Sequence, residues 1–374
     1  MKIWNSPAGN FKLERYPYKG DPSHQAWDAA DDWIVRHIPS QDKPALIIGE
    51  AFGALAVAWN AGDIYAAGDS FMAHQALRLN RKLNDLPGQE RLNIVPTTEP
   101  PAESFDRIFL RLPKSLNLLD YYIRYALKAA AEGAEIWVGG MDKRWSPGVK
   151  KLTDRLLEIS EVFKFEKRAR WIRFRAPENQ PPTASERPGW ELHEWNLKFR
   201  AAPDVFSSST LDEGTKAFIS AFPKRETEAA GMIADIGCGS GILGFCAARI
   251  NGDAEYLFTD ESYLAVANAE ENYRLNGLAA EARFIADNGL ESIGANSVDL
   301  VLLNPPFHFQ NIQSREPADF MFSEAYRCLK PGGCLQIVGN THLGYHRLLE
   351  DWFDRQKTVY KSRKFTVLRA VKRR

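Results

Sequence analysis

The stretch ADIGCGSGIL at residues 234–243 decides the fold; it follows an apolar run and opens into an alanine-rich segment. Its glycines Gly237, Gly239 and Gly241 predict a sharp backbone turn, because glycine reaches positive φ without a steric penalty. A strand that ends in such a turn and continues into a helix is typical of a parallel α/β sheet. The free N–H groups at the start of that helix face any ligand that binds over the turn.

The first half of the chain contains a related stretch, LIIGEAFGAL, at residues 46–55. Further pairs follow in the same order: 65–70 with 256–262, Leu79-Asn80 with Leu275-Asn276, 105–110 with 298–303, 136–139 with 336–339, and 167–172 with 361–366. Each half therefore alternates short apolar strands with helical segments of about 10 to 15 residues. We predict an α/β protein of two tandem Rossmann-like domains, each a doubly wound, mostly parallel sheet.

The segment between Pro177 and Pro188 is rich in proline and polar residues, as linkers between domains are. We place the domain boundary there, with residues 1–180 in one domain and residues 181–374 in the other. A chain of 374 residues, 44% of them hydrophobic, is long enough to build two separate cores.

Two acids accompany the glycine-rich turn of the second half. Asp235 precedes the first glycine, and Asp260 ends the next apolar strand, where an acid can hold ribose hydroxyls. A dinucleotide site usually shows Gly-x-Gly-x-x-Gly, spaced for a pyrophosphate. The spacing here resembles instead motif I of the S-adenosylmethionine-dependent methyltransferases, in which the acid and glycines surround the amino-acid end of the cofactor; an ordinary tight turn is the alternative. The cofactor-binding candidates around this turn are Asp235, Gly237, Cys238, Gly239, Gly241, Asp260 and Glu261.

The turn in the first half lacks these features. Ile47, Ala51 and Phe52 stand where the second half has Asp235, Gly239 and Ser240. A phenylalanine ring would fill the space in which a ligand approaches the backbone. We therefore expect residues 1–180 to keep the fold without the cofactor, as a degenerate methyltransferase-like domain that serves as a scaffold or binds substrate.

The sequence Asn304-Pro305-Pro306-Phe307 follows the apolar run at 298–303 and provides the candidate catalytic residues. An amino group conjugated to a base ring is a poor nucleophile, because its lone pair is delocalised into the ring. The side-chain carbonyl of Asn304 and the backbone carbonyl of Pro305 can hold its two N–H bonds and aim the lone pair at a methyl donor, while the prolines fix the loop. Phe307 can stack on the base. Positioning and electrostatics then supply most of the rate, without a strong general base.

The matching place in the first half reads Arg111-Leu112-Pro113-Lys114, which has no amide acceptor and no aromatic ring. The pattern therefore assigns the chemistry to the second half. After the motif, His308 can contact a substrate phosphate or cap a turn. Asp287 and Asn288, which follow the strand at 282–285, can accept a hydrogen bond from an adenine amine or simply form a polar turn.

Together these motifs resemble the tandem-domain ribosomal RNA guanine-N2 methyltransferases, and the large-subunit (23S) members more than the small-subunit (16S) ones. The more discriminating segments are 25–31, 51–55, 112–116 and 364–372. The resemblance implies class I methyltransferase domains, S-adenosyl-L-methionine as cofactor, and a guanine of protein-free 23S rRNA as substrate. It also implies that Phe206 and Asp212, within 204–207 and 211–214, line the cofactor pocket.

The residues by themselves leave other substrates open. A guanine N2 in 16S rRNA, an adenine N6 and a protein glutamine are planar amines that the same Asn-Pro-Pro-aromatic motif can methylate, commonly with tyrosine at the place of Phe307. A non-catalytic RNA-binding protein or RNA chaperone is the alternative from another class. The intact Asp235, its glycines and Asn304 argue against that alternative.

Charge is balanced overall but not locally. The formal net charge is zero, yet residues 357–374 hold eight Lys or Arg and no acid, and residues 143–175 hold eleven against four acids. Such stretches can contact RNA phosphates. Trp171 and Phe174, within the basic stretch 170–175, can offer a stacking surface for an unpaired base, or belong to an edge strand that charge protects.

Composition also argues against disulfides, a metal site and a membrane span. The four cysteines lie in apolar or glycine-rich runs without Cys-x-x-Cys pairs, and we expect neither disulfides nor a metal site. There is no signal peptide and no apolar run near the length of a membrane span. We expect a cytoplasmic protein without membrane contact, and predict no particular oligomeric state.

Overall fold

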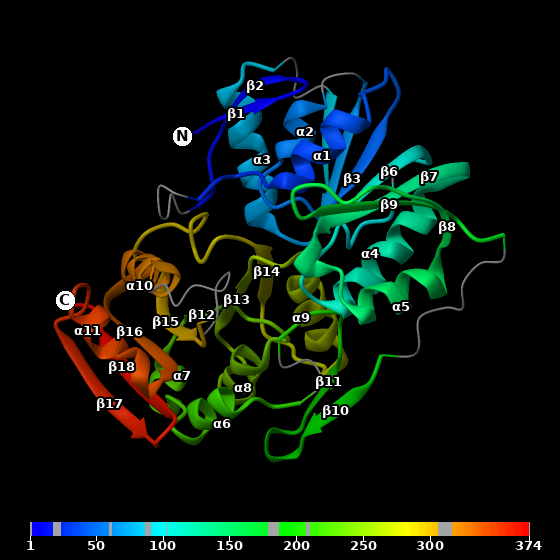
Figure 1. Cartoon of the computed structure of the whole chain (residues 1–374). Helices are drawn as coiled ribbons and strands as arrows, with labels where there is room; N and C mark the ends of the chain where they lie inside the picture. The colour runs from blue at the N-terminus through cyan, green and yellow to red at the C-terminus, as the bar shows by residue number, and fades with distance from the viewer. Residues whose placement is uncertain are drawn as a thin grey trace. The chain divides into compact units, whose positions relative to one another are not determined.

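The computed structural model describes residues 2–17, 24–59, 62–86, 91–101, 103–178, 187–206, 210–305 and 316–373, except the side chains of residues 316 and 317. It divides into two compact units, Met1–Ser185 and Glu186–Arg374 (Figure 1). The division lies within the proline-rich segment of the sequence.

The first unit begins with a hairpin of β1 (Lys2–Ser6) and β2 (Gly9–Leu13) and continues as a sheet of seven strands. The strands of this sheet are β3 (Ala45–Ile48), β4 (Ile64–Gly68), β5 (Leu92–Pro96), β6 (Phe105–Arg111), β7 (Ala130–Met141), β8 (Glu158–Val162) and β9 (Ala169–Arg175). The α-helices are α1 (Ala29–His37), α2 (Ala54–Ala58), α3 (Phe71–Leu83), α4 (Leu116–Ala129) and α5 (Pro147–Leu156).

The second unit repeats this plan, from a hairpin of β10 (Gly189–Leu192) and β11 (Leu197–Arg200) onward. Its sheet holds β12 (Met232–Ile236), β13 (Glu255–Asp260), β14 (Ala282–Ala286), β15 (Val298–Leu303), β16 (Leu329–Asn340), β17 (Arg355–Lys361) and β18 (Phe365–Val371). The α-helices are α6 (Glu213–Ser220), α7 (Lys224–Ala229), α8 (Ile242–Ile250), α9 (Tyr263–Leu275), α10 (Glu316–Cys328) and α11 (Tyr345–Glu350).

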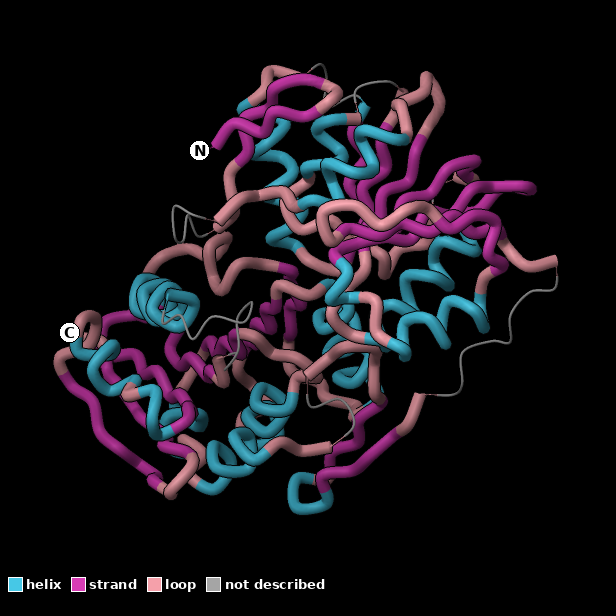
Figure 2. The backbone as a smooth tube through the Cα atoms, viewed as in Figure 1, coloured by secondary structure: helices cyan, strands magenta, loops and turns pink. Residues whose placement is uncertain are grey.

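The two sheets have the same strand order, β5-β4-β3-β6-β7-β9-β8 and β14-β13-β12-β15-β16-β18-β17. The first five strands of each are parallel, and the last two join antiparallel. Helices pack around the strands of each sheet (Figure 2). The structure thus confirms the predicted pair of doubly wound, mostly parallel sheets. Open sheets of this kind bind ligands at the carboxyl ends of the strands where the order reverses, here beside β3 and β12.

The central strands are apolar because both faces of each sheet are covered there, whereas the edge strands β8 and β17 are polar and largely exposed. In β15, Leu300 and Leu302 enter the core on one face of the second sheet, while Val301 and Leu303 enter the core on the other. Successive side chains of a strand point to opposite faces. When both faces of the sheet are covered, both sets of side chains are buried and therefore apolar. The continuous apolar runs in the sequence therefore predicted the strands correctly.

An asparagine fastens the hairpin in each unit in the same way. Asn84, at the end of α3, accepts a hydrogen bond from Lys12 N at 2.7 Å and donates one to Lys12 O at 2.8 Å. Asn276, at the end of α9, makes the same two bonds to Lys198, both at 2.7 Å. The repeat therefore includes the hairpins, which the sequence comparison missed.

This contact also corrects one pair in that comparison. The pairing of Leu79-Asn80 with Leu275-Asn276 is wrong by one helical turn, because Leu83 and Asn84 end α3 as Leu275 and Asn276 end α9. Leu-Asn steps recur one turn apart in the first half, so spacing alone could not choose between them.

The predicted stacking surface at Trp171 and Phe174 is wrong. Both side chains are fully buried in β9, and the Trp171 indole donates to Ala30 O at 2.9 Å. The edge-strand alternative is wrong too, because β8 lies outside β9 at the edge. The four cysteines are buried and free. No helix in the described parts of the chain is long and apolar enough to cross a membrane.

Candidate active site

The glycine-rich turn follows β12, the central strand at which the order of the second sheet reverses. Gly237, Gly239 and Gly241 have φ values of 63°, 54° and 88°, in the left-handed region that favours glycine. A Cβ at Gly241 would lie 2.4 Å from the ring of Phe245, whereas a Cβ at Gly237 would meet no described atom within 4 Å. The turn is therefore packed against its own helix at one end and open at the other.

Two buried carboxylates hold this turn. Asp235 accepts from Gly244 N in α8 at 2.8 Å, and Asp260 accepts from Gly239 N at 2.9 Å and from Ser262 N at 3.0 Å. Burial raises the pKa of Asp235 to about 8, the Gly244 N–H opposes the shift, and the nearby charge of Asp260 adds to it. Burial likewise raises the pKa of Asp260. Both predicted cofactor residues thus shape the turn itself.

Three further cofactor candidates lie next to the turn. A Cβ on Gly239 would be 3.2 Å from the backbone oxygen of Phe206, whose side chain is 56% exposed. The buried Cys238 ties the turn to the neighbouring strand, because its backbone N donates to Thr259 O at 3.0 Å. Glu261, partly buried, comes directly after β13.

Asp287 and Asn288 form a polar turn after β14. Asp287 accepts from Asn288 N at 2.8 Å and from the Ser292 N and Oγ at 3.0 and 2.7 Å, while Asn288 donates to Glu291 at 3.3 Å. The backbone N of Asp287 donates to Asp260 O at 2.9 Å. This polar turn therefore lies at the same sheet edge as the acid that ends β13.

Asn304 follows β15, the strand that pairs with β12, and so stands beside the glycine-rich turn. Its Nδ2 donates to Thr215 Oγ1 at 3.1 Å, whereas its Oδ1 is buried with no hydrogen-bond partner among the described residues. Buried carbonyl oxygens without a partner are uncommon, since each costs free energy. Pro305 is buried directly after it. Pro306, Phe307 and His308 lie outside the described residues.

The other predicted pocket residue, Asp212, is the N-cap of α6. One of its oxygens accepts from Gly214 N at 2.8 Å and from Thr215 N at 3.0 Å, and the other accepts from the Thr215 hydroxyl. Sequence analysis missed Thr215, although an acid three residues before it is the usual sign of a capped helix. Among the described residues, no group of three or more His, Cys, Asp or Glu could hold a metal.

The corresponding turn of the first unit keeps only part of this geometry. Gly49 and Gly53 have φ values of 77° and 74°, close to those of their counterparts in the second unit. Ala51, which replaces Gly239, has no positive φ. The backbone of this turn therefore follows a different path at the residue where the second unit has its middle glycine.

Glu50 fills the place above that turn. Its carboxylate accepts from the backbone N of Leu55 at 2.7 Å and of Ala56 at 3.2 Å, at the start of α2. Ala56 corresponds to Gly244, which Asp235 binds in the second unit. Burial and the charge of Asp31 raise the pKa of Glu50 to about 7.

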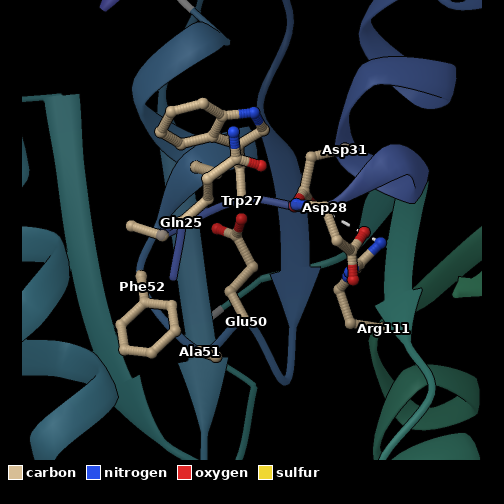
Figure 3. A pocket seen from close by; sticks show the side chains of 10 residues that line it. Gln25, Trp27, Asp28, Asp31, Glu50, Ala51, Phe52 and Arg111 are labelled. Carbon is tan, nitrogen blue, oxygen red and sulfur yellow. Dashed lines mark hydrogen bonds and ion pairs between the residues drawn. The ribbon is translucent and has the colours of Figure 1, made fainter. Parts of the chain in front are cut away.

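Arg111 stands where the second unit has Asn304. It donates to Asp28 at 2.9 Å and pairs with Asp31 at 3.5 Å, and these two acids occupy the α1 positions that Asp212 and Thr215 occupy in α6 (Figure 3). Burial opposes the charge of Arg111, but Asp31 and Asp28 hold its pKa above the usual value. These residues line a cavity of about 150 Å³ together with Gln25, Ala26, Trp27, Glu50, Ala51, Phe52 and Ala54.

Comparison with known proteins places both units. Residues 1–179 match the model of the RLMG N-terminal domain, and residues 196–369 match that of the methyltransferase small domain. The chain is 35% identical to the ribosomal RNA large subunit methyltransferase G of Stutzerimonas stutzeri, over 100% of both chains. It belongs to the ribosomal RNA large subunit methyltransferase G family. The Yersinia pestis member is 33% identical, over 97% of this chain and 92% of its own.

Membership of this family confirms the predicted resemblance and makes the chain a methyltransferase. A solved structure of the same architecture is a 16S rRNA N2 methyltransferase of T. thermophilus with AdoMet and guanosine. It has a TM-score of 0.80, covers 100% of this chain and 98% of its own, and shares 20% sequence identity, so the likeness concerns the fold.

Proposed function

We propose that this methyltransferase transfers a methyl group from S-adenosyl-L-methionine to the exocyclic N2 of a guanine in 23S rRNA, at the site beside Asn304. The buried Oδ1 of Asn304 carries the proposal, because this acceptor has no partner within the described residues and lies next to an open glycine-rich turn. The names of the relatives, which match the chain over its full length, support the large-subunit RNA as substrate.

The second unit fits the cofactor. The turn leaves room above Gly237, and the carboxylates of Asp235 and Asp260 hold it in shape through Gly244 N and Gly239 N. We assign to cofactor binding Phe206, Asp212, Asp235, Gly237, Cys238, Gly239, Gly241, Asp260, Glu261, Asp287, Asn288 and Asn304. When bound, S-adenosylmethionine supplies an electrophilic methyl group on a sulfonium.

Asn304 and Pro305 act on the amino group of the substrate. Each offers a carbonyl oxygen to one N–H bond, so that the nitrogen becomes pyramidal and its lone pair is withdrawn from conjugation with the base ring. Phe307 stacks on the base and fixes its plane. The nitrogen becomes acidic as it gains the methyl group, so its proton passes to solvent without a strong base. Positioning therefore supplies most of the rate.

The first unit binds or supports the RNA without a cofactor. Glu50 accepts from the N–H groups at the start of α2, which a ligand would otherwise bind. Arg111 places a cation where the second unit has the acceptor oxygen of Asn304. In the second unit, Lys357, Lys361 and Lys364 are exposed on β17 and the loop after it, where they can contact RNA phosphates. We further propose that the substrate is protein-free 23S rRNA and that the enzyme acts in the cytoplasm.

Labelled S-adenosylmethionine, incubated with the purified enzyme and RNA from cells that lack it, tests the proposal. Protein-free 23S rRNA, protein-free 16S rRNA and intact large subunits are offered separately, and the labelled nucleoside is identified after digestion. We expect N2-methylguanosine from protein-free 23S rRNA. N6-methyladenosine, or a labelled glutamine in a protein, would contradict the proposed substrate, and labelling of 16S rRNA alone would assign the enzyme to the other ribosomal subunit.

A further inference from the structure

We propose that Asp212 and Thr215 form a positioning relay that fixes which end of the Asn304 amide faces the substrate. The inference deepens the proposed function and rests on it, since it assumes that Asn304 accepts a hydrogen bond from the amine being methylated. Thr215 is a positioning residue, because it acts through Asn304.

The direction of the relay follows from counting protons. A threonine hydroxyl has one proton to donate, and a carboxylate only accepts. Thr215 donates that proton to Asp212, so its oxygen can only accept from Asn304. The amide NH2 of Asn304 must therefore be the group that lies 3.1 Å from Thr215 Oγ1. With the opposite orientation of the amide, Asn304 Oδ1 and Thr215 Oγ1 would face each other as two acceptors. Only the orientation with the NH2 group toward Thr215 allows a hydrogen bond.

The relay starts from fixed backbone. The carboxylate of Asp212 is held by Gly214 N and Thr215 N at the start of α6, and Thr215 is 3% exposed. The same helix buries Ala217 and Phe218 in the core of the second unit. Neither the hydroxyl nor the carboxylate can therefore reorient without loosening the first turn of α6.

The consequence is that Asn304 Oδ1 points away from Thr215 and is left buried without a partner in the part of the chain that the structure describes. This carbonyl is the atom that the substrate amine needs as an acceptor. Without the relay the amide could rotate by half a turn, and its NH2 would then meet the NH2 of the substrate. Folding of the unit already includes the free-energy cost of burying this oxygen without a hydrogen bond. The acceptor is therefore oriented before the base binds.

The first unit supports this interpretation. There the three equivalent positions hold Asp28, Asp31 and Arg111, which form an ion-paired cluster. A guanidinium has no acceptor to orient, and the hydroxyl of the relay is absent. The relay therefore occurs in the second unit, which carries the amide of Asn304. In the first unit an ion-paired cluster takes its place.

Three single variants of the full-length enzyme test the relay. Thr215→Val keeps the side-chain shape and removes the hydroxyl, Thr215→Ser restores it, and Thr227→Val is the matched control. Thr227 is a buried threonine of the same unit whose hydroxyl donates to Pro223 O at 2.9 Å. Methyl transfer to rRNA, cofactor affinity by calorimetry and the midpoint of thermal unfolding are measured for each.

We expect Thr215→Val to lower kcat roughly 10- to 100-fold, as misplaced catalytic groups do, with KM for the RNA and Kd for the cofactor nearly unchanged. Thr215→Ser should recover most of kcat. Thr227→Val should lose stability and keep kcat. A wild-type kcat in Thr215→Val, or a folded Thr215→Ser with normal cofactor affinity and no recovery, overturns the relay.

A second route covers the case in which Thr215→Val does not fold. Asp212→Asn keeps a residue that caps helices well but can donate to the Thr215 oxygen, so that the Thr215 hydroxyl proton is free to turn toward Asn304 and the direction of the relay is no longer fixed. We expect its kcat to fall as well, and an unchanged kcat overturns the relay. The nucleoside identified in the same assay tests the proposed function separately: if another planar amine is methylated, the proposed substrate fails while the ratios among variants still decide the relay.

Discussion

Asn304 follows β15 and Arg111 ends the equivalent strand β6, and each contacts the start of an equivalent helix. In the second unit the contact leaves the Asn304 carbonyl oxygen with no partner in the described ranges, whereas in the first unit a guanidinium is shared between Asp28 and Asp31. The sheets around them have the same order of strands. The comparison teaches that both copies of the duplicated domain can keep the same sheet and core, while a few polar side chains at the strand ends determine which copy has a catalytic site.

The helix starts beside the two glycine-rich turns differ in the same manner. Asp235 reaches Gly244 N from within β12, which leaves the surface of the turn open. Glu50 reaches the equivalent N–H of Ala56 from the turn itself and so covers it. A helix N-terminus needs an acceptor from somewhere. In the first unit the chain provides that acceptor where a ligand would lie.

The largest effect should come from removing the amide of the second unit. We expect Asn304→Ala to lower kcat by roughly 100- to 1000-fold, in the range seen when one stabilising group is lost from a catalytic site. Arg111→Ala should leave kcat per folded molecule unchanged. This difference would show that only one of the two equivalent positions takes part in methyl transfer. Initial rates of methyl transfer decide, and full activity in Asn304→Ala would remove it from the mechanism.

Removing the cation of the first unit should act on stability. Arg111→Ala leaves Asp28 and Asp31 without their partner, and breaking such a buried pair costs about 3 kcal/mol. Asn304→Ala should lower the unfolding free energy by only about 1 kcal/mol, because it removes one side-chain hydrogen bond, to Thr215 Oγ1, and an oxygen that has no partner among the described residues. Urea unfolding of both variants measures the difference; equal stability of Arg111→Ala and wild type would show that the cluster contributes nothing net.

Exchanging the residues at the middle of the turns should give a smaller effect. Gly239→Ala places a side chain at φ 54° with its Cβ 3.2 Å from Phe206 O. A left-handed alanine costs about 1–2 kcal/mol, so we expect cofactor Kd to rise roughly 10-fold. Ala51→Gly in the first unit is the control and should not create a cofactor site. Titration calorimetry measures both, and unchanged binding by Gly239→Ala would mean that the turn needs no glycine there.

The smallest effect concerns Glu50 and pH. Its pKa is about 7 in the folded chain, mainly because of burial, and near 4.3 when unfolded. Between these values the folded protein keeps a proton that the unfolded chain has lost, so this group's contribution to stability falls as pH rises from 5 to 7. Glu50→Gln cannot titrate, and its Tm should gain on that of wild type by roughly 5 °C over that range. A constant difference in Tm would assign Glu50 an ordinary pKa.

Much of the fold and part of the site could be predicted from local patterns. The glycine spacing at 237–241 and the apolar runs of the strands predicted both sheets, and the replacements at Ala51 and Phe52 pointed to the altered turn. The hairpins β1–β2 and β10–β11 were missed, because what holds them is an asparagine 78 residues away in the second unit and 72 in the first. Trp171 and Phe174 were misplaced because strand order, which a single strand does not reveal, buries them.

By itself, the sequence determined where the backbone must turn and which runs must be covered on both faces, because φ preference and side-chain alternation depend on neighbours along the chain. Only the tertiary structure decided which polar atoms would have partners. Asn304 and Thr215 are 89 residues apart, and their bond exists because folding brings the residue after β15 to the first turn of α6. Hydrogen bonds are short and directional, so a partner is fixed by packing and cannot be counted from spacing.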